Sequence, residues 1–291
     1  VGGPAPGQFL ATTNGASPFG QVGGNRELEN EKARSWSLGL VYQPPAIRNL
    51  RLSIDYSHIR LANAISRFDL NTAQAACYDS PNFPNETACQ AFRRLNAAEA
   101  AAQSAATGRQ RIAGDIADGY QETYYNSALL DFAGIIGEIN YAFAVPNVAG
   151  TEPGQLRLGV KAFYIDYFRN QASGGSPVIE GAGTVGSPRW DVNGRIGYSF
   201  DPFDWDVQLL WSSKTVHSRT ATIENTPVND YPSYTLVNTT FSARVTDNFS
   251  LQFSVRNLFD RAVPYSATVN RAFGVFDPIG RTFTARAAVS F

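Results

Sequence analysis

The chain has 291 residues, enough for one large domain or two ordinary ones, and no linker-like stretch divides it. Charged residues are 17% of the sequence, below the roughly 25% of typical soluble domains. The net charge of −1 gives no electrostatic basis for binding nucleic acid, and the lack of any run of about eighteen apolar residues excludes a membrane helix.

Residues 1–34 are rich in glycine and proline, which predicts irregular surface chain. After this segment, nine stretches alternate apolar and polar residues, the pattern of strands with two different surroundings. Each is close to the roughly nine to eleven residues that a tilted strand needs to cross a bilayer. The predicted strands are Ser35–Tyr42, Leu50–Ile59, Ile135–Phe143, Leu156–Tyr167, Trp190–Phe200, Trp205–Lys214, Tyr234–Val245, Leu251–Phe259 and Arg281–Phe291.

The connections between these strands alternate between short and long. Short turns are predicted at residues 43–45, 201–204 and 246–248, whereas residues 66–125 form the longest connection. Short turns on one side and long loops on the other are how an antiparallel transmembrane β-barrel is built. A soluble β-sandwich also alternates apolar and polar positions, but it has no reason to sort its loops by length.

The two faces of the predicted strands differ in charge. One set of alternate positions, which includes Leu209, Phe241 and Phe253, is apolar, and we expect no charge on it because a charge facing lipid is costly. The other set is polar and would face the lumen or a plug. Its charged members are Arg51, Asp55, Glu138, Arg157, Lys161, Asp191, Arg195, Asp206, Arg256 and Arg286. Aromatic residues mark both ends of the strands, as bilayer interfaces select.

The start of the chain predicts that it is a piece of a longer protein. It begins at Val1, contains no methionine and shows no signal peptide, and nine strands is an odd number for a bacterial barrel. We therefore expect residues 1–34 to be a truncated extracellular loop and residues 35–291 to be the C-terminal portion of an outer-membrane barrel.

The only two cysteines, Cys77 and Cys89, lie in the loop of residues 66–125. In an oxidising compartment such a pair predicts a disulfide, although two free thiols remain an alternative and a zinc site would need further ligands. In the same loop, residues 96–106 predict one short helix with Asn96 as N-cap and Glu99 three residues later. The tyrosines that might touch a ligand from outer loops are Tyr78, Tyr120, Tyr124 and Tyr125, with loop packing as the alternative.

Three short motifs can be recognised along the sequence. Residues 250–260 are SLQFSVRNLFD, and residues 277–283, DPIGRTF, lead into a last strand that closes on Phe291. Upstream, residues 24–32 are GNRELENEK, with Arg26 and Asn30 where proline is usual. Together these motifs resemble the C-terminal part of a TonB-dependent outer-membrane receptor.

This resemblance implies an all-β fold with about nine strands of a barrel of about 22. It also implies energy-coupled uptake of a large scarce nutrient, such as a ferric siderophore, an oligosaccharide or cobalamin, across the outer membrane of a Gram-negative bacterium. The implied partners are outer-membrane lipid, the plug domain of the same full-length protein, the TonB complex and the barrel-assembly machinery. Phe291 would be the signal for that machinery. Nothing in the chain resembles the plug or the TonB box.

Two other functions are weighed against transport by a receptor. A passive porin-like or structural barrel is the first alternative, and an outer-membrane enzyme is the second. The chain has only two histidines, His58 and His217, and lacks the motifs of hydrolases, metalloproteases and phosphate-binding loops. The sequence therefore predicts no catalysis, no metal site and no cofactor.

Overall fold

The structure, a computed structural model, describes residues 20–67, 70–122, 124–146, 153–171, 177–224, 226–264 and 278–290. The chain divides into two compact units, which are treated separately below. Unit 1 comprises Val1–Arg34, Ile59–Asp131 and Arg169–Ile179, and unit 2 comprises Ser35–His58, Phe132–Phe168 and Glu180–Phe291.

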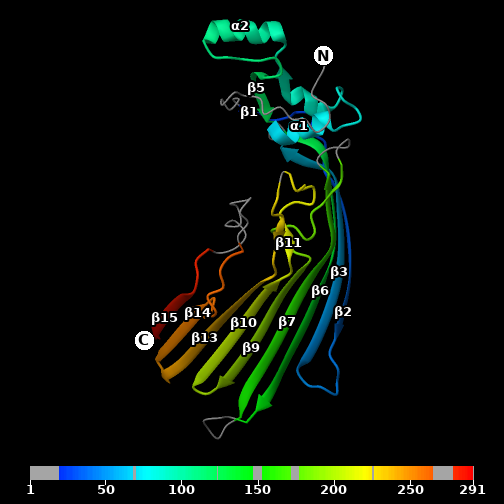
Figure 1. Cartoon of the computed structure of the whole chain (residues 1–291). Helices are drawn as coiled ribbons and strands as arrows, with labels where there is room; N and C mark the ends of the chain where they lie inside the picture. The colour runs from blue at the N-terminus through cyan, green and yellow to red at the C-terminus, as the bar shows by residue number, and fades with distance from the viewer. Residues whose placement is uncertain are drawn as a thin grey trace. The chain divides into compact units, whose positions relative to one another are not determined.

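The main sheet contains all nine predicted strands in the predicted order (Figure 1). The strands are β2 (Lys32–Tyr42), β3 (Leu50–Arg67), β6 (Tyr124–Val145), β7 (Gly154–Gln171), β9 (Trp190–Phe200), β10 (Phe203–Ser212), β13 (Tyr234–Thr246), β14 (Phe249–Arg256) and β15 (Thr282–Val289). Each strand pairs with its neighbours in the chain, and the pairs from β7 to β15 are antiparallel. A short strand, β8 (Ile179–Glu180), also pairs with β7. The antiparallel barrel-type sheet is confirmed.

Some strands are longer than predicted. β3 continues eight residues past Ile59, and β6 begins eleven residues before Ile135. The prediction stopped where apolar alternation stopped, but backbone pairing needs no apolar side chain. At the other extreme, β14 ends at Arg256 instead of Phe259, because Asn257 has a φ of 53° and bonds with its side chain to the backbone of Arg261.

Unit 1 holds a second, smaller sheet that the sequence did not predict. It is built from β1 (Gly20–Val22), β5 (Ile116–Glu122) and β4 (Phe92–Arg94), with β1 parallel and β4 antiparallel to β5. The irregular chain expected over residues 1–34 therefore contains strand β1 and the start of β2.

The prediction of a single helix was wrong in number. Unit 1 contains α1 (Leu70–Tyr78), a 3-10 helix η1 (Thr87–Ala91) and α2 (Ala97–Thr107). α1 and η1 are held together by small buried side chains: Ala73, Ala76, Cys77, Ala88 and Ala91. Because alanine gives only a weak apolar signal, α1 is defined by this packing rather than by its periodicity.

The predicted helix is α2, and its N-terminal capping box is confirmed. The Asn96 side chain accepts a hydrogen bond from the Glu99 backbone N–H at 2.8 Å, and the Glu99 carboxylate accepts one from the Asn96 N–H at 2.8 Å. At the other end, Gly108 adopts a left-handed φ of 66°, which ends the helix. Within the part of the chain that the structure describes, no helix is long and apolar enough to cross a membrane.

Beyond β10 the chain forms one more small pair, β11 (Thr215–Val216) with β12 (Asp230–Tyr231). Tyr231 of this pair is only 2% exposed, so its ring is packed inside unit 2 where the loop begins and ends.

Candidate functional site: the two faces of the sheet

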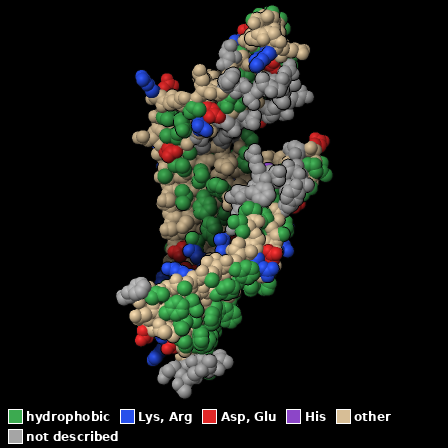
Figure 2. Space-filling model, turned by 90° about the vertical axis from the view of Figure 1, so that its left-hand side faces the viewer, with side chains coloured by type: hydrophobic (Ala, Val, Ile, Leu, Met, Phe, Trp, Pro, Cys, Tyr) green, Lys and Arg blue, Asp and Glu red, His purple; other side chains and the backbone are tan. Residues whose placement is uncertain are grey.

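The register of the main sheet sorts its side chains onto two faces, because residues directly opposite each other point the same way. Leu209 lies opposite Gly194 and Val237, and Phe241 lies opposite Phe253. The face that carries these residues is called the apolar face below. Large apolar side chains on this face are exposed, for example Leu38 at 72% and Phe253 at 48%. Figure 2 shows hydrophobic side chains gathered in one patch over the sheet.

Aromatic residues gather at both ends of the apolar face, as predicted. At the long-loop end, the rings of Tyr164 and Trp190 are 4.7 Å apart, and those of Trp36 and Tyr56 are 5.1 Å apart. At the short-turn end, Tyr198 stacks on Phe200 at 4.8 Å. Such rims suit the two interfaces of a bilayer.

The expectation of an apolar face without any charge needs two corrections within the predicted strands. Arg281 begins the predicted strand Arg281–Phe291 at the same alternate positions as Phe283 and Ala287, and it is exposed just before β15 starts. Asp166 occupies the same alternate positions of β7 as Leu158, and it is exposed. It lies two residues beyond Tyr164, past the aromatic rim of the long-loop end. Charge is tolerated there because a side chain beyond the rim reaches water.

The opposite face, called the polar face below, holds a network of ion pairs. Asp206 lies 2.8 Å from the Nε of Arg195 and 3.8 Å from the Nη2 of Arg157. Arg157 also pairs with Asp204 at 2.8 Å, and Ser199 bonds to both of these residues. The network joins β7, β9 and β10 and balances two positive charges with two negative ones.

Asp204 and Ser199 were missed by the sequence prediction. Residues 201–204 were assigned to a turn, but β10 begins at Phe203, so that Asp201 and Pro202 alone separate β9 from β10. Asp204 therefore lies on the polar face, two residues before Asp206. The signal that could have identified Asp204 is its spacing of two residues from Asp206, because alternate residues of a strand lie on the same face.

Two of the hollows on the polar face of unit 2 are lined by charged side chains of both signs. The hollow beside the ion pairs has a volume of about 380 Å³, and Glu138 and Lys161 line it together with Arg157, Arg195 and Asp206. The second has a volume of about 600 Å³ and is lined by Arg286, Asp204 and Arg244 among others. A wall with charges of both signs suits contact with a polar partner better than an ion-selective ring, which favours one sign.

The remaining charged residues predicted for this face lie outside both hollows. Asp191 accepts a hydrogen bond from Ser212 at 3.2 Å, and a Cβ at Gly39 would collide with the Asp55 carboxylate. Arg256 lies opposite Thr282 at the end of β14, and Arg51 is an exposed residue of β3. All four occupy polar-face positions, but the structure does not bring them into one cluster.

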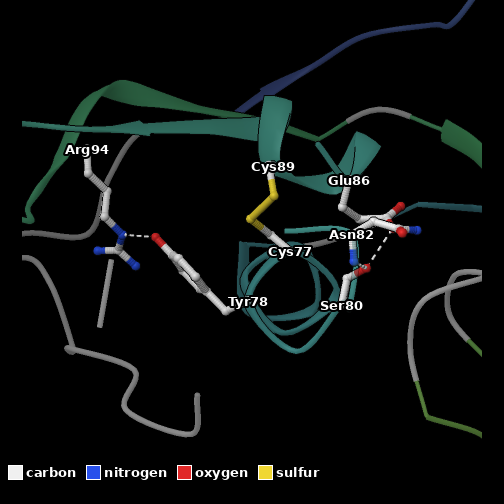
Figure 3. Close-up of a disulfide and its surroundings, with 7 residues drawn as sticks. All are labelled: Cys77, Tyr78, Ser80, Asn82, Glu86, Cys89 and Arg94. Carbon is white, nitrogen blue, oxygen red and sulfur yellow. Dashed lines mark hydrogen bonds between the residues drawn. A yellow bond between two sulfur atoms is a disulfide. The ribbon is translucent and has the colours of Figure 1, made fainter. Parts of the chain in front are cut away.

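The predicted disulfide is confirmed in unit 1. Cys77 at the end of α1 is bonded to Cys89 in η1 (Figure 3). The segment between them is tightened further, because the Ser80 hydroxyl donates to the Glu86 carboxylate at 2.9 Å and accepts from the Asn82 N–H at 3.1 Å. This bond excludes both the free thiols and a zinc site that uses them.

The sequence matches the family described as TonB dependent receptor-like, beta-barrel, over residues 2–258. The chain belongs to the TonB-dependent receptor β-barrel family. Barrels of this family are outer-membrane proteins, and the family consists of receptors and transporters. No curated protein matches the chain.

Solved receptors share this fold. The siderophore receptor PirA from Acinetobacter baumannii has a TM-score of 0.58 at 14% identity, over 93% of this chain and 33% of that chain. A mutant ferric enterobactin receptor from Pseudomonas aeruginosa, in complex with enterobactin, gives 0.54 at 17%, with the same two coverages. The FrpB iron transporter from Neisseria meningitidis gives 0.54 at 10%, over 94% and 33%. The chain thus spans about a third of the length of these solved proteins.

In this TonB-dependent receptor barrel, two of the four tyrosines predicted to touch a ligand have packing roles in unit 1. The ring of Tyr78 is 5.4 Å from that of Phe83 and 5.9 Å from that of Phe92. Its hydroxyl accepts a hydrogen bond from Arg94 at 2.5 Å (Figure 3). The ring of Tyr120 occupies the space that a Cβ at Gly20 would fill. Tyr124 is 38% exposed, and the side chain of Tyr125 lies outside the described residues.

The two histidines of the receptor barrel lie in different settings. His58 is part of the aromatic rim, 5.9 Å from the ring of Trp36 and 6.2 Å from that of Tyr167. His217 donates its backbone N–H to Asn229 O at 2.7 Å. Among the residues that the structure describes, no three histidine, cysteine, aspartate or glutamate side chains come together as a metal site. Phe291, the predicted assembly signal, lies outside the described residues.

Proposed function

We propose that this chain is the C-terminal barrel segment of a TonB-dependent transporter that takes up a large scarce nutrient with energy delivered through TonB. The observation that carries the proposal is the contrast between the two faces in a chain of this family. The apolar face would contact outer-membrane lipid, and the polar face, with paired Arg157, Arg195 and Asp206, would line the lumen.

The polar face would hold the plug domain of the full-length protein. A plug that must move during transport needs contacts that form and break in water, and exposed ion pairs contribute only about 0 to 1 kcal/mol each. The charged residues proposed to face the lumen or plug are the ten named above, from Arg51 to Arg286. Energy coupling would come from the TonB complex acting on that plug.

The long connections would lie outside the cell. In this proposal residues 1–34 belong to a truncated extracellular loop, and residues 66–125 form a second one within the barrel segment of residues 35–291. The disulfide between Cys77 and Cys89 would give the tip of this loop a fixed shape. Tyr124 and Tyr125 are then the better candidates for ligand contact, because Tyr78 and Tyr120 are engaged in packing.

A ferric siderophore is the first substrate to test, ahead of an oligosaccharide or cobalamin. Of the similar solved proteins, one is named a siderophore receptor, one a ferric enterobactin receptor and one an iron transporter. At 10–17% identity they support the fold, and the substrate of this chain is taken from them as a proposal.

Uptake by bacteria that carry the complete gene tests the proposal. Cells are supplied with a labelled ferric siderophore, labelled cobalamin or a labelled oligosaccharide, and uptake is compared among the parent, a strain lacking this gene and a strain lacking TonB. We expect the uptake of one of these substrates to be lost to the same extent in both deletion strains. Uptake that needs this gene but not TonB would instead identify a passive porin-like barrel.

A further inference from the structure

A recess on the polar face of unit 2 lies where two positions of the sheet have no side chain. Gly159 of β7 lies opposite Arg195 of β9, and Gly197 of β9 lies opposite Arg157 of β7. A Cβ at Gly159 would stand 3.2 Å from Asn140 Oδ1, and one at Gly197 would stand 3.0 Å from Arg157 Nε. The two glycines thus form part of the floor of the 380 Å³ hollow described above, which is called the glycine recess below.

The glycine recess contains one cation without a counter-charge. Lys161 lines it and is exposed, and this side chain makes no ion pair or hydrogen bond within the part of the chain that the structure describes. The other two cations of the wall are paired, because Arg157 contacts Asp204 at 2.8 Å and Arg195 contacts Asp206 at 2.8 Å. The lysine is therefore the cation that is left for an occupant of the recess.

The acidic side chains of the same wall do not neutralise Lys161. Glu138 of β6 lines the recess, but its Oε1 accepts a hydrogen bond from Asn140 Nδ2 at 2.6 Å, and it forms no ion pair with the lysine among the residues described. Asp206 is engaged as well, since its Oδ1 accepts a hydrogen bond from Arg195 Nε at 2.8 Å. Both carboxylates of the recess already have a donor, whereas the ammonium group has no acceptor.

Arg195 offers further donors close to the lysine. Its side chain is 67% exposed, and of its side-chain nitrogens only Nε makes a hydrogen bond to a described residue. Lys161 lies opposite Asn193, two residues from Arg195 on β9, so the two cations are diagonal neighbours on one face of adjacent strands. Diagonal neighbours in an antiparallel pair are about 7 to 8 Å apart, which is within reach of two long side chains.

We propose that Lys161 and the guanidinium group of Arg195 bind a carboxylate in the glycine recess. The inference rests on the proposed function, which makes the polar face the wall of the lumen. A carboxylate carries the single negative charge that one unpaired lysine needs, and the planar edge of a guanidinium matches its two oxygens. A phosphate ester, with a charge of about −1.5 to −2, would be repelled more strongly by Glu138 in the same wall.

Two sources can present this carboxylate: an aspartate or glutamate of the plug, or a carboxylate on the transported nutrient. The recess, at about 380 Å³, is within the range of roughly 300 to 1,000 Å³ that is typical of small-molecule sites. It therefore has room for either an amino-acid side chain or the end of a larger ligand. Both present the same chemical group, and cross-linking without a spacer separates them.

The test uses the complete receptor, purified in detergent and treated with a water-soluble carbodiimide. The reagent activates a carboxylate, and a lysine amine in contact with it then forms an amide, with overall loss of water. If the plug is the source, peptide mass spectrometry should show Lys161 joined to an aspartate or glutamate of the plug. If the source is soluble, labelled succinate added to the sample should modify Lys161 in preference to Lys32 and Lys214, the other two lysines of the chain.

Two results of this cross-linking would overturn the inference. An amide between Lys161 and Glu138 would show that the wall neutralises its own lysine. Reaction at Lys161 no greater than at Lys214, both with and without succinate, would show that no carboxylate is held in the recess.

A filled recess tests the site without changing any charge. Gly159→Leu should abolish the amide at Lys161, because the new side chain occupies the floor of the recess. The matched control Gly137→Leu adds the same side chain on the apolar face of β6, where a Cβ meets nothing within 4 Å, and should leave the reaction unchanged. An undiminished amide in Gly159→Leu would overturn the inference.

A second variant keeps the test decisive if Gly159→Leu loses the heat-modifiable migration of a folded barrel. Arg195→Gln is then measured, and removal of this exposed charge should slow amide formation at Lys161 by about fivefold. No change in the rate would overturn the inference.

The result can be separated from that of the proposed function, because cross-linking is read on purified protein and transport in cells. Failed TonB-dependent uptake together with a specific amide at Lys161 counts against transport alone. Normal uptake without such an amide counts against this inference alone.

Discussion

Asp206 accepts a hydrogen bond from the Nε of Arg195 at 2.8 Å, across the β9–β10 hairpin. The same carboxylate lies near Arg157 on β7, so one acidic group links three strands of the polar face. The arginine of the hairpin is 67% exposed and the aspartate 21%, which places the pair in a hydrated setting.

This pair should contribute little to stability. In a double-mutant cycle with Arg195→Gln and Asp206→Asn, we expect a coupling energy below about 1 kcal/mol, falling further in high salt. Urea unfolding of the complete receptor in lipid vesicles measures it. A coupling above about 2 kcal/mol would show that water is excluded from this part of the polar face.

Neighbouring residues of β14 should respond in opposite ways to arginine. Phe253→Arg places a charge on the apolar face opposite Phe241, at a cost of about 2 to 4 kcal/mol near the middle of a bilayer. Ser254→Arg is the matched control, since Ser254 bonds to Thr240 on the polar face. Folding into lipid vesicles, followed by heat-modifiable gel migration, should fail for the first and succeed for the second. Equal tolerance would contradict the assignment of the faces.

Loss of the disulfide should loosen unit 1. The variant Cys77→Ser/Cys89→Ser removes a cross-link over a sequence separation of 12, which is worth about 3 kcal/mol. Limited proteolysis should therefore cut residues 79–88 many times faster in the variant than in the parent. Mass spectrometry without reductant checks the parent, where two alkylatable thiols would refute the bond.

The capping box of α2 should be worth about 1 kcal/mol. Asn96→Ala removes the acceptor for the Glu99 N–H, and hydrogen exchange of the first turn of α2 should become about fivefold faster. Ala102→Gln changes an exposed position of the same helix and should alter exchange by no more than about twofold. Similar exchange in Asn96→Ala and the parent would mean that packing, rather than the cap, fixes this end.

Deletion of Phe291 should impair insertion into the outer membrane, if the terminal aromatic residue is read by the barrel-assembly machinery. Phe291→Tyr keeps an aromatic ring and serves as the control. The amount of heat-modifiable receptor in outer-membrane fractions measures the effect. Normal insertion of the shortened chain would argue against this role.

The main sheet was predictable because its surroundings impose a period of two on every strand. The bounds of β9 agree with the prediction at both ends. The fold of unit 1 was not predictable in this way, because α1 and β1 depend on segments that are distant in the sequence rather than on a local pattern. Ala73 of α1 and Ala88 of η1 belong to one buried cluster, and β1 pairs with β5. The charged positions of the polar face were identified from alternation, but which of them pair depends on the register. Asp204 shows this, because only the two-residue turn before β10 aligns it with Arg157.

The main sheet is an open row whose outermost members are β2 and β15. Along each of these borders, backbone amides and carbonyls point away from the sheet with no strand beside them among the residues described. When this chain is prepared by itself, its two edge strands should therefore pair with other extended polypeptides, including further copies of the chain. Co-expression with the remaining strands of the proposed full-length receptor should prevent this, because both edge strands can then pair before the chain associates with its own copies.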